Sequence, residues 1–97
     1  MTGPPVQLSR LRDIGFAAWD PIGVIDYGQP WKDHPAADEY DGYLLDTVGR
    51  LRRGGGEVDA IDYLLWVERE HIGVQRPDAR ERASATVRSI HAYLASL

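Results

Sequence analysis

The sequence predicts an all-α protein, a compact bundle of about four short helices, and three observations support this prediction. Apolar residues recur at intervals of three and four in four segments, which is the period of a helix with one buried face. Glycines follow the ends of two of these segments, where the left-handed backbone conformation often terminates a helix. No segment has a convincing strand pattern. We expect residues 1–5 to be a flexible N-terminus and residues 6–97 to form a single helical domain.

The first helix is predicted over residues 6–18. Its apolar face consists of Leu8, Leu11, Ile14 and Ala18. Gly15 lies beside this face, and its missing side chain would let another helix approach closely. Residues 19–33 are predicted to form a long ordered loop, because prolines and glycines interrupt any regular pattern there.

The second helix is predicted over residues 35–53. Acidic residues near its start and three arginines near its end both suit the helix dipole. Its buried face would consist of Tyr40, Leu44, Thr47, Val48 and Leu51. Three glycines, residues 54–56, then end the helix. The acidic residues of this helix indicate a solvated face or, alternatively, a surface for a basic partner.

The third helix is predicted over residues 57–72 and the fourth over residues 77–97. Helical spacing places one set of apolar residues of the third helix on a common face: Val58, Ile61, Leu64, Leu65 and Ile72. The fourth helix has the most regular amphipathic pattern in the chain.

One carboxylate falls in the middle of the apolar face of the third helix. A charged Glu68 at that position would be costly unless it is hydrogen-bonded or paired. We therefore expect Glu68 to meet an arginine, a tyrosine hydroxyl or loop amides. Two alternatives stay open. Glu68 could be a buried, neutral carboxyl group facing a cleft, and thus a candidate acid or base, or the helix could be rotated so that Glu68 is exposed.

The third helix has a second apolar side, formed by Tyr63, Trp66 and Val67. A helix that is apolar on two sides lies at the centre of a bundle or at an interface. Tyrosine and tryptophan are favoured at the energetic centres of protein interfaces. These three residues are therefore either central packing residues or a candidate interface for a homodimer or another protein partner.

Composition excludes several functional classes. The chain has no cysteine, so disulfides, thiolate catalysis and zinc–thiolate sites are excluded. Its net charge of -4 argues against general nucleic-acid binding, which relies on clustered lysines and arginines. No apolar run is long enough to span a membrane. Residues 1–5 lack the features of a secretory signal, and we therefore expect a cytoplasmic protein.

No set of residues predicts catalysis, a cofactor or a metal site. The serines and histidines are spread over separate segments, so no nucleophile–base arrangement is visible. Glu68 and His71 have the Glu-x-x-His spacing of dinuclear metal bundles, but such sites need two copies of this motif. We therefore expect no metal and no cofactor, and we favour a non-enzymatic protein, with an enzyme that uses Glu68 as an open alternative.

Four pieces of sequence together resemble the YugE-like family of small, uncharacterised helical bacterial proteins. They are W-D-P-I-G-V from Trp19, D-E-Y-D-G-Y-L from Asp38, I-D-Y-L from Ile61 and E-R-E-H-I-G-V from Glu68. The resemblance covers about residues 14–74. It implies a compact helical fold and no assigned activity.

The first of these pieces also has a physical interpretation. Asp20 precedes Pro21, which favours an extended backbone at Asp20, and its carboxylate could accept loop N–H groups. Trp19 would then anchor the loop on the core, which is a structural role. The functional alternative is a ligand pocket built from Trp19, Asp20, Tyr40 and Glu68.

These observations favour a non-enzymatic protein-interaction module, able to self-associate or to bind a protein partner. One alternative is an immunity or antitoxin-like protein, because an acidic chain suits a basic partner through charge complementarity. The other is a small-ligand binder or an enzyme that uses Glu68.

Overall fold

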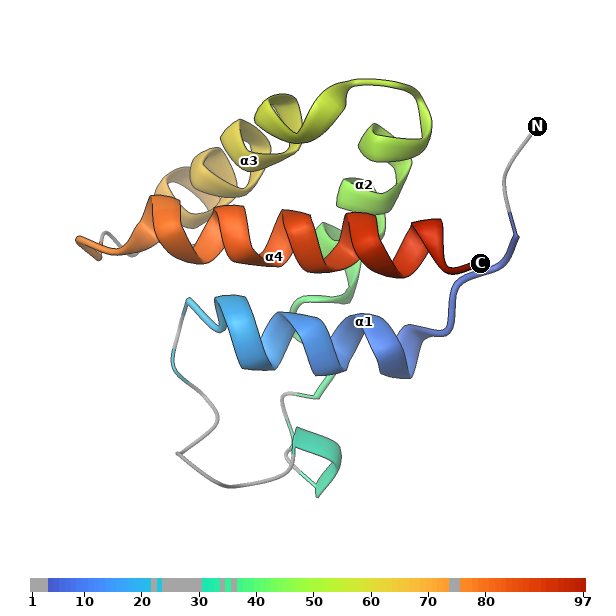
Figure 1. The fold of residues 1–97 in the computed structure, drawn as a ribbon. Coiled ribbons are helices and arrows are strands. Elements are labelled where there is room, and N and C mark those ends of the chain that lie inside the picture. The colour runs from blue at the N-terminus through green and yellow to red at the C-terminus, as the bar shows by residue number, and fades with distance from the viewer. Residues whose placement is uncertain (1–3, 22, 24–30, 34, 36, 74–75) are drawn as a thin grey trace.

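The computed structural model describes residues 4–21, 23, 31–33, 35, 37–73 and 76–97. Within these residues the chain forms α1 (Leu8–Ile14), α2 (Asp41–Arg52), α3 (Gly56–Trp66) and α4 (Ala79–Ala95), and it forms no strand (Figure 1). The predicted all-α bundle is thus confirmed. Among these residues, no helix has the length and apolarity needed to cross a membrane.

Two π-helical segments extend these helices. Gly15–Trp19 continues α1, and Val67–Ile72 continues α3. Each segment closes with a backbone hydrogen bond to the carbonyl five residues earlier, donated by Asp20 in one case and by Gly73 in the other, both at 2.9 Å. Such wide turns are rare and occur frequently at functional sites. A short 3₁₀ turn spans Trp31–Asp33.

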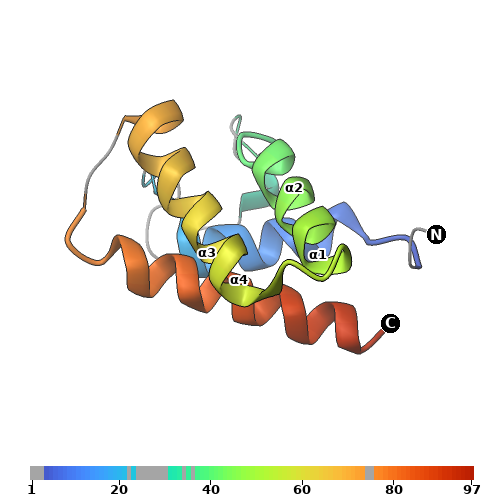
Figure 2. The same ribbon diagram turned by 90° about the horizontal axis from the view of Figure 1, so that it is seen from above.

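The helices form two layers. Helices α1 and α4 run side by side in opposite directions, and α2 and α3 pack across them (Figures 1 and 2). A glycine-rich turn joins α2 to α3, and Gly54 and Gly56 in it have φ of 80° and 77°, which favours glycine over other residues. The core lies between the layers and consists of Leu11, Trp19, Tyr40, Leu44, Val48, Ala60, Leu64, Val67, Ala83, Val87 and Ile90.

Three of the four predicted helices begin and end close to the observed positions, but α2 begins at Asp41 and not near Pro35. The reason is the packing of Tyr40, which is buried and has a non-helical backbone. The centre of its ring lies 5.2 Å from the ring centres of both Phe16 and Trp19. The chain therefore turns inward before the helix starts. Most of the predicted loop, residues 22 and 24–30, lies outside the described residues.

Gly15 makes the close helix contact that its sequence position indicates. A Cβ atom at Gly15 would lie only 2.8 Å from Cδ1 of Leu44, which is itself buried in α2. The absence of a side chain therefore lets the first helical segment rest directly on α2.

The third helix is rotated relative to the predicted face. The buried side of α3 and its extension is formed by Ala60, Leu64 and Val67, whereas Val58 is 66% exposed. Because α3 packs against both α2 and α4, its most buried line runs between the two predicted apolar sides. Val67 is therefore a central packing residue, which is one of the two alternatives that the sequence left open, whereas the assignment of Val58 to the buried face is wrong.

Candidate functional site

The carboxylate of Glu68 contacts an arginine, which is one of the partners that the sequence predicts. Glu68 is 2% exposed, and its two oxygens accept hydrogen bonds from the guanidinium of Arg82 at 2.8 and 3.2 Å. Arg82 comes from α4 and is also largely buried. This two-point geometry is the strongest form of an arginine–carboxylate contact, so the negative charge of Glu68 is compensated inside the chain.

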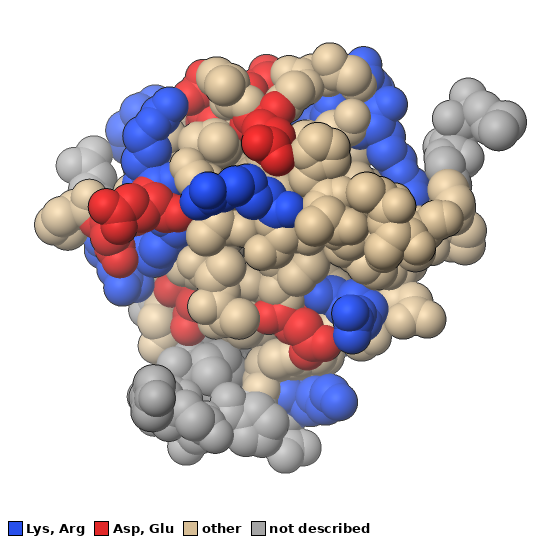
Figure 3. Space-filling model, viewed as in Figure 1, with Lys and Arg blue, Asp and Glu red and all other residues tan. Residues whose placement is uncertain are grey.

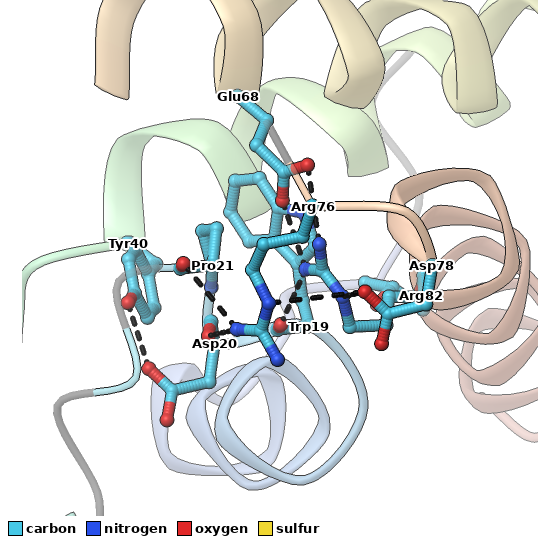
Figure 4. Close-up of polar contacts among 9 residues, drawn as sticks. Trp19, Asp20, Pro21, Tyr40, Glu68, Arg76, Asp78 and Arg82 are labelled. Atoms are coloured by element: carbon cyan, nitrogen blue, oxygen red, sulfur yellow. Dashed lines mark hydrogen bonds and ion pairs between the residues drawn. The ribbon is translucent and has the colours of Figure 1, made fainter. Parts of the chain in front are cut away.

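Arg82 joins three parts of the fold. Besides Glu68, its guanidinium donates to the carbonyl of Trp19 at 3.0 Å and to a carboxylate oxygen of Asp78 at 2.9 Å (Figure 4). Burial acts to lower the pKa of Arg82, but the hydrogen bonds to Glu68 and Asp78 outweigh it, and the pKa is raised. The hydrogen bond from Arg82 in turn lowers the pKa of Asp78. Arg82 and Asp78 are thus both held in their charged forms.

Asp20 occupies an unusual backbone conformation beside this cluster. Its φ is 30°, in the left-handed region, and not extended as the following proline had indicated. The cause is its position at the end of the first π-helical segment, where its N–H closes the wide turn. Its side chain accepts a hydrogen bond from the hydroxyl of Tyr40 at 2.8 Å. The guanidinium of Arg76 reaches the carbonyls of Asp20 and Pro21 at 3.4 and 3.5 Å (Figure 4).

The structure thus brings the four predicted pocket residues into one cluster. Asp20 and Tyr40 contact each other directly, and Glu68 reaches Trp19 through Arg82. However, Trp19, Tyr40 and Glu68 are all buried. In this conformation they cannot contact a ligand in solvent, and the arrangement ties the ends of two π-helical segments to α4. This geometry favours the structural interpretation of the motif.

Sequence reasoning missed Arg82, although two features of the sequence indicate it. Arg82 follows Asp78 by four residues, so both lie on one face of a helix. It also lies next to Ala83 on the border of the apolar face of α4. An arginine at such a border is the natural partner of a lone carboxylate on another apolar helix face.

A second candidate site lies on the exposed edge of α2 and α3. Trp66 is 45% exposed, and the centre of its ring lies 4.5 Å from the ring centre of His71 and 6.3 Å from that of Tyr63. We call Tyr63, Trp66 and His71 the aromatic face. Val67 does not belong to it, because its side chain is in the core.

The second π-helical segment explains the contact between Trp66 and His71. In a regular α-helix, residues five apart point in directions about 140° apart and do not meet. The wider turn over Val67–Ile72 contains more residues and brings His71 beside Trp66. The unusual helix geometry therefore fixes the position of an exposed tryptophan.

Tyr63 is held firmly at the other end of the aromatic face. Its hydroxyl donates to Asp46 at 2.7 Å, and the guanidinium of Arg50 lies 4.2 Å from the centre of its ring. Burial and the hydrogen bond to Asp46 raise the pKa of Tyr63. Both α2 residues lie at helical spacing and join the aromatic face to α2.

The described residues bring no three acidic or histidine side chains together as metal ligands. Glu68 and His71, which share the metal-type spacing, point to different places: Glu68 contacts Arg82, and His71 contacts Trp66.

A scan against protein-family models finds no match for this chain, and searches of curated proteins and of solved structures find none either. The resemblance to the YugE-like family stays a prediction.

Proposed function

We propose that this protein is a non-enzymatic protein-interaction module and that the aromatic face of α3 is its docking surface. The observation that carries the proposal is Trp66, a large aromatic side chain that is 45% exposed yet held in place by two neighbouring rings. An anchor residue that is already ordered loses little entropy when it binds. Tryptophan is also the residue type most enriched at the energetic centres of interfaces.

The buried contact between Glu68 and Arg82 supports the same proposal, because it argues against the ligand-binding alternative. Glu68 was the candidate for a ligand-binding or enzymatic role, but both of its oxygens are bound by Arg82. Exchanging that contact for a ligand would leave a buried arginine with one fewer partner, which is costly. We therefore place the functional chemistry at the exposed face and a structural role at Glu68.

The aromatic face is small. Leu45 is another exposed apolar residue, but it follows Asp41 by one helical turn, on the side of α2 that contacts Arg12 of α1. The α3 side of the same helix instead presents Asp46 and Arg50. Because the exposed apolar residues are separated, the face suits a short segment of a partner better than a large obligate interface.

We also propose that the protein is located in the cytoplasm.

Photo-crosslinking tests this function in cells of the source organism. A photoreactive amino acid replaces Arg69, an exposed residue one turn after Trp66, and in a second protein it replaces the exposed Glu81 on α4. We expect a discrete crosslinked species from position 69 and none from position 81. Trp66→Ala should abolish that species. The matched variant Val58→Ala, which removes another exposed apolar side chain of α3, should leave it unchanged.

Two results would overturn the proposal. One is the absence of a crosslinked species that is specific to position 69. The other is a species that Trp66→Ala and Val58→Ala affect equally. Light scattering at several concentrations then shows whether the bound chain is a second copy of the protein or a different one.

A further inference from the structure

The exposed edge of α3 repeats one arrangement of side chains. Asp59 precedes Tyr63 by four residues, and Asp62 precedes Trp66 by four residues. Residues four apart on a helix are neighbours on its surface, so each aromatic ring has a carboxylate one turn away. We call these two arrangements the Tyr63 unit and the Trp66 unit.

The Tyr63 unit is occupied by a cation from the same chain. The guanidinium of Arg50 lies 4.2 Å from the centre of the Tyr63 ring, and its Nη1 lies 3.3 Å from an oxygen of Asp59. A planar guanidinium stacks on aromatic faces and pairs with carboxylates at the same time, which a lysine ammonium does less well. The Tyr63 unit therefore shows that an aromatic ring with a carboxylate one turn before it accommodates a guanidinium group.

In the part of the chain that the structure describes, the Trp66 unit holds no such cation. Among the described residues, no arginine or lysine lies over the Trp66 ring. Asp62 is 63% exposed in its side chain, and its nearest cation, Arg80, lies 3.7 Å away, beyond hydrogen-bonding distance. Exposed pairs of this kind contribute little and exchange easily. Tryptophan is moreover a better cation–π acceptor than tyrosine.

The flanking charges also fit a basic ligand. Glu70, four residues after Trp66, is exposed, and among the described residues it pairs only with its chain neighbour Arg69, at 3.0 Å. Figure 3, in which α4 runs across the face in view, shows separate patches of both signs on that face, without one dominant basic surface. The whole chain has a net charge of -4, so long-range attraction favours a basic partner over a second copy of this chain.

We propose that the Trp66 unit binds the guanidinium group of an arginine in a basic segment of a protein partner. The arginine would stack on Trp66 and pair with Asp62, as Arg50 does on Tyr63 and Asp59. This inference rests on the proposed function, because it names the chemistry of the partner that docks on the aromatic face.

The test is a nuclear magnetic resonance titration of the full chain with a short arginine-rich peptide. The indole N–H resonance of Trp66, assigned with Trp66→Phe, reports binding at the site. A peptide in which every arginine is replaced by citrulline has nearly the same shape but no charge. We expect the arginine peptide to shift the Trp66 resonance and to bind at least about fivefold more tightly than the citrulline peptide, which corresponds to about 1 kcal/mol.

Variants of the chain locate the contact. Asp62→Asn should weaken binding of the arginine peptide severalfold, and added salt should do the same because Asp62 is exposed. Trp66→Ala should weaken binding at least as much, measured by the amide resonances of α3. Val58→Ala should bind the peptide as the unaltered chain does.

Equal affinity for the two peptides would overturn the inference, and so would the absence of any shift at Trp66. If the crosslink from position 69 still depends on Trp66 in that case, the face docks a partner of different chemistry and the proposed function survives. If that crosslink is absent as well, both proposals fail.

Discussion

Glu68 shows how far single residues can be interpreted from sequence. A carboxylate on the apolar face of a helix predicts a buried partner, because an unpaired charge there would be too costly. The identity of that partner depends on the fold, since Arg82 lies 14 residues later on a different helix. Sequence therefore predicted the need for a partner at Glu68, and only the packing of α4 shows which residue meets it.

Replacing one residue of the Glu68–Arg82 ion pair should lower the free energy of unfolding strongly, whereas replacing both should lower it much less. Glu68→Leu leaves the guanidinium of Arg82 buried with less compensation, and we expect a loss of about 3–5 kcal/mol in the free energy of unfolding. The double variant, Glu68→Leu with Arg82→Met, buries no charge at this position, and it should recover more than half of that loss. Urea unfolding of the purified proteins measures both values.

A double variant that is less stable than Glu68→Leu alone would contradict this interpretation. It would mean that Arg82 stabilises the fold mainly through Trp19 and Asp78, and not through Glu68.

At the scale of whole elements, sequence periodicity could not predict side-chain contacts where the backbone leaves the regular α-helical period. Patterns of three and four residues assume 3.6 residues per turn, and two segments, Gly15–Trp19 and Val67–Ile72, have wider turns. For this reason the sequence could not show that His71 contacts Trp66. Val58 is exposed although the sequence placed it on the buried face, because a helix packed on two sides has no single apolar face.

The contact between the first helical segment and α2 should tolerate no additional atom at Gly15. In Gly15→Ala the new methyl group would lie 2.8 Å from Cδ1 of the buried Leu44, and we expect a loss of about 1–3 kcal/mol. The control is Gly42→Ala in α2, where nothing lies within 4 Å of the added Cβ. That variant should be unchanged or more stable by about 0.5–1 kcal/mol, because alanine favours the helix.

Thermal or urea unfolding of these two variants provides the comparison. Equal effects of the two substitutions would show that the helices do not pack as closely as the structure indicates at Gly15.

At the scale of the molecule, the fold class was predictable because composition and helical period suffice to define it. The proposed functional surface was less predictable from the sequence. Three residues were predicted as a possible interface, and burial separates them: Val67 lies in the core, Tyr63 is tied to α2, and Trp66 is exposed. The remaining part of the proposed binding unit, Asp62, could not be distinguished by sequence from the other acidic residues of a solvated helix surface.

Oxidative labelling with hydroxyl radicals tests the central claim, that Trp66 is covered by another protein chain in the cell, most directly. Trypsin cleavage after Arg53 and Arg69 isolates Trp66 as the single tryptophan of its peptide, so its oxidation can be quantified by mass spectrometry. We expect Trp66 to be oxidised in the purified protein and protected in cells of the source organism, while Val58 in the same peptide is labelled alike in both. Equal oxidation of Trp66 in the two settings would contradict the claim.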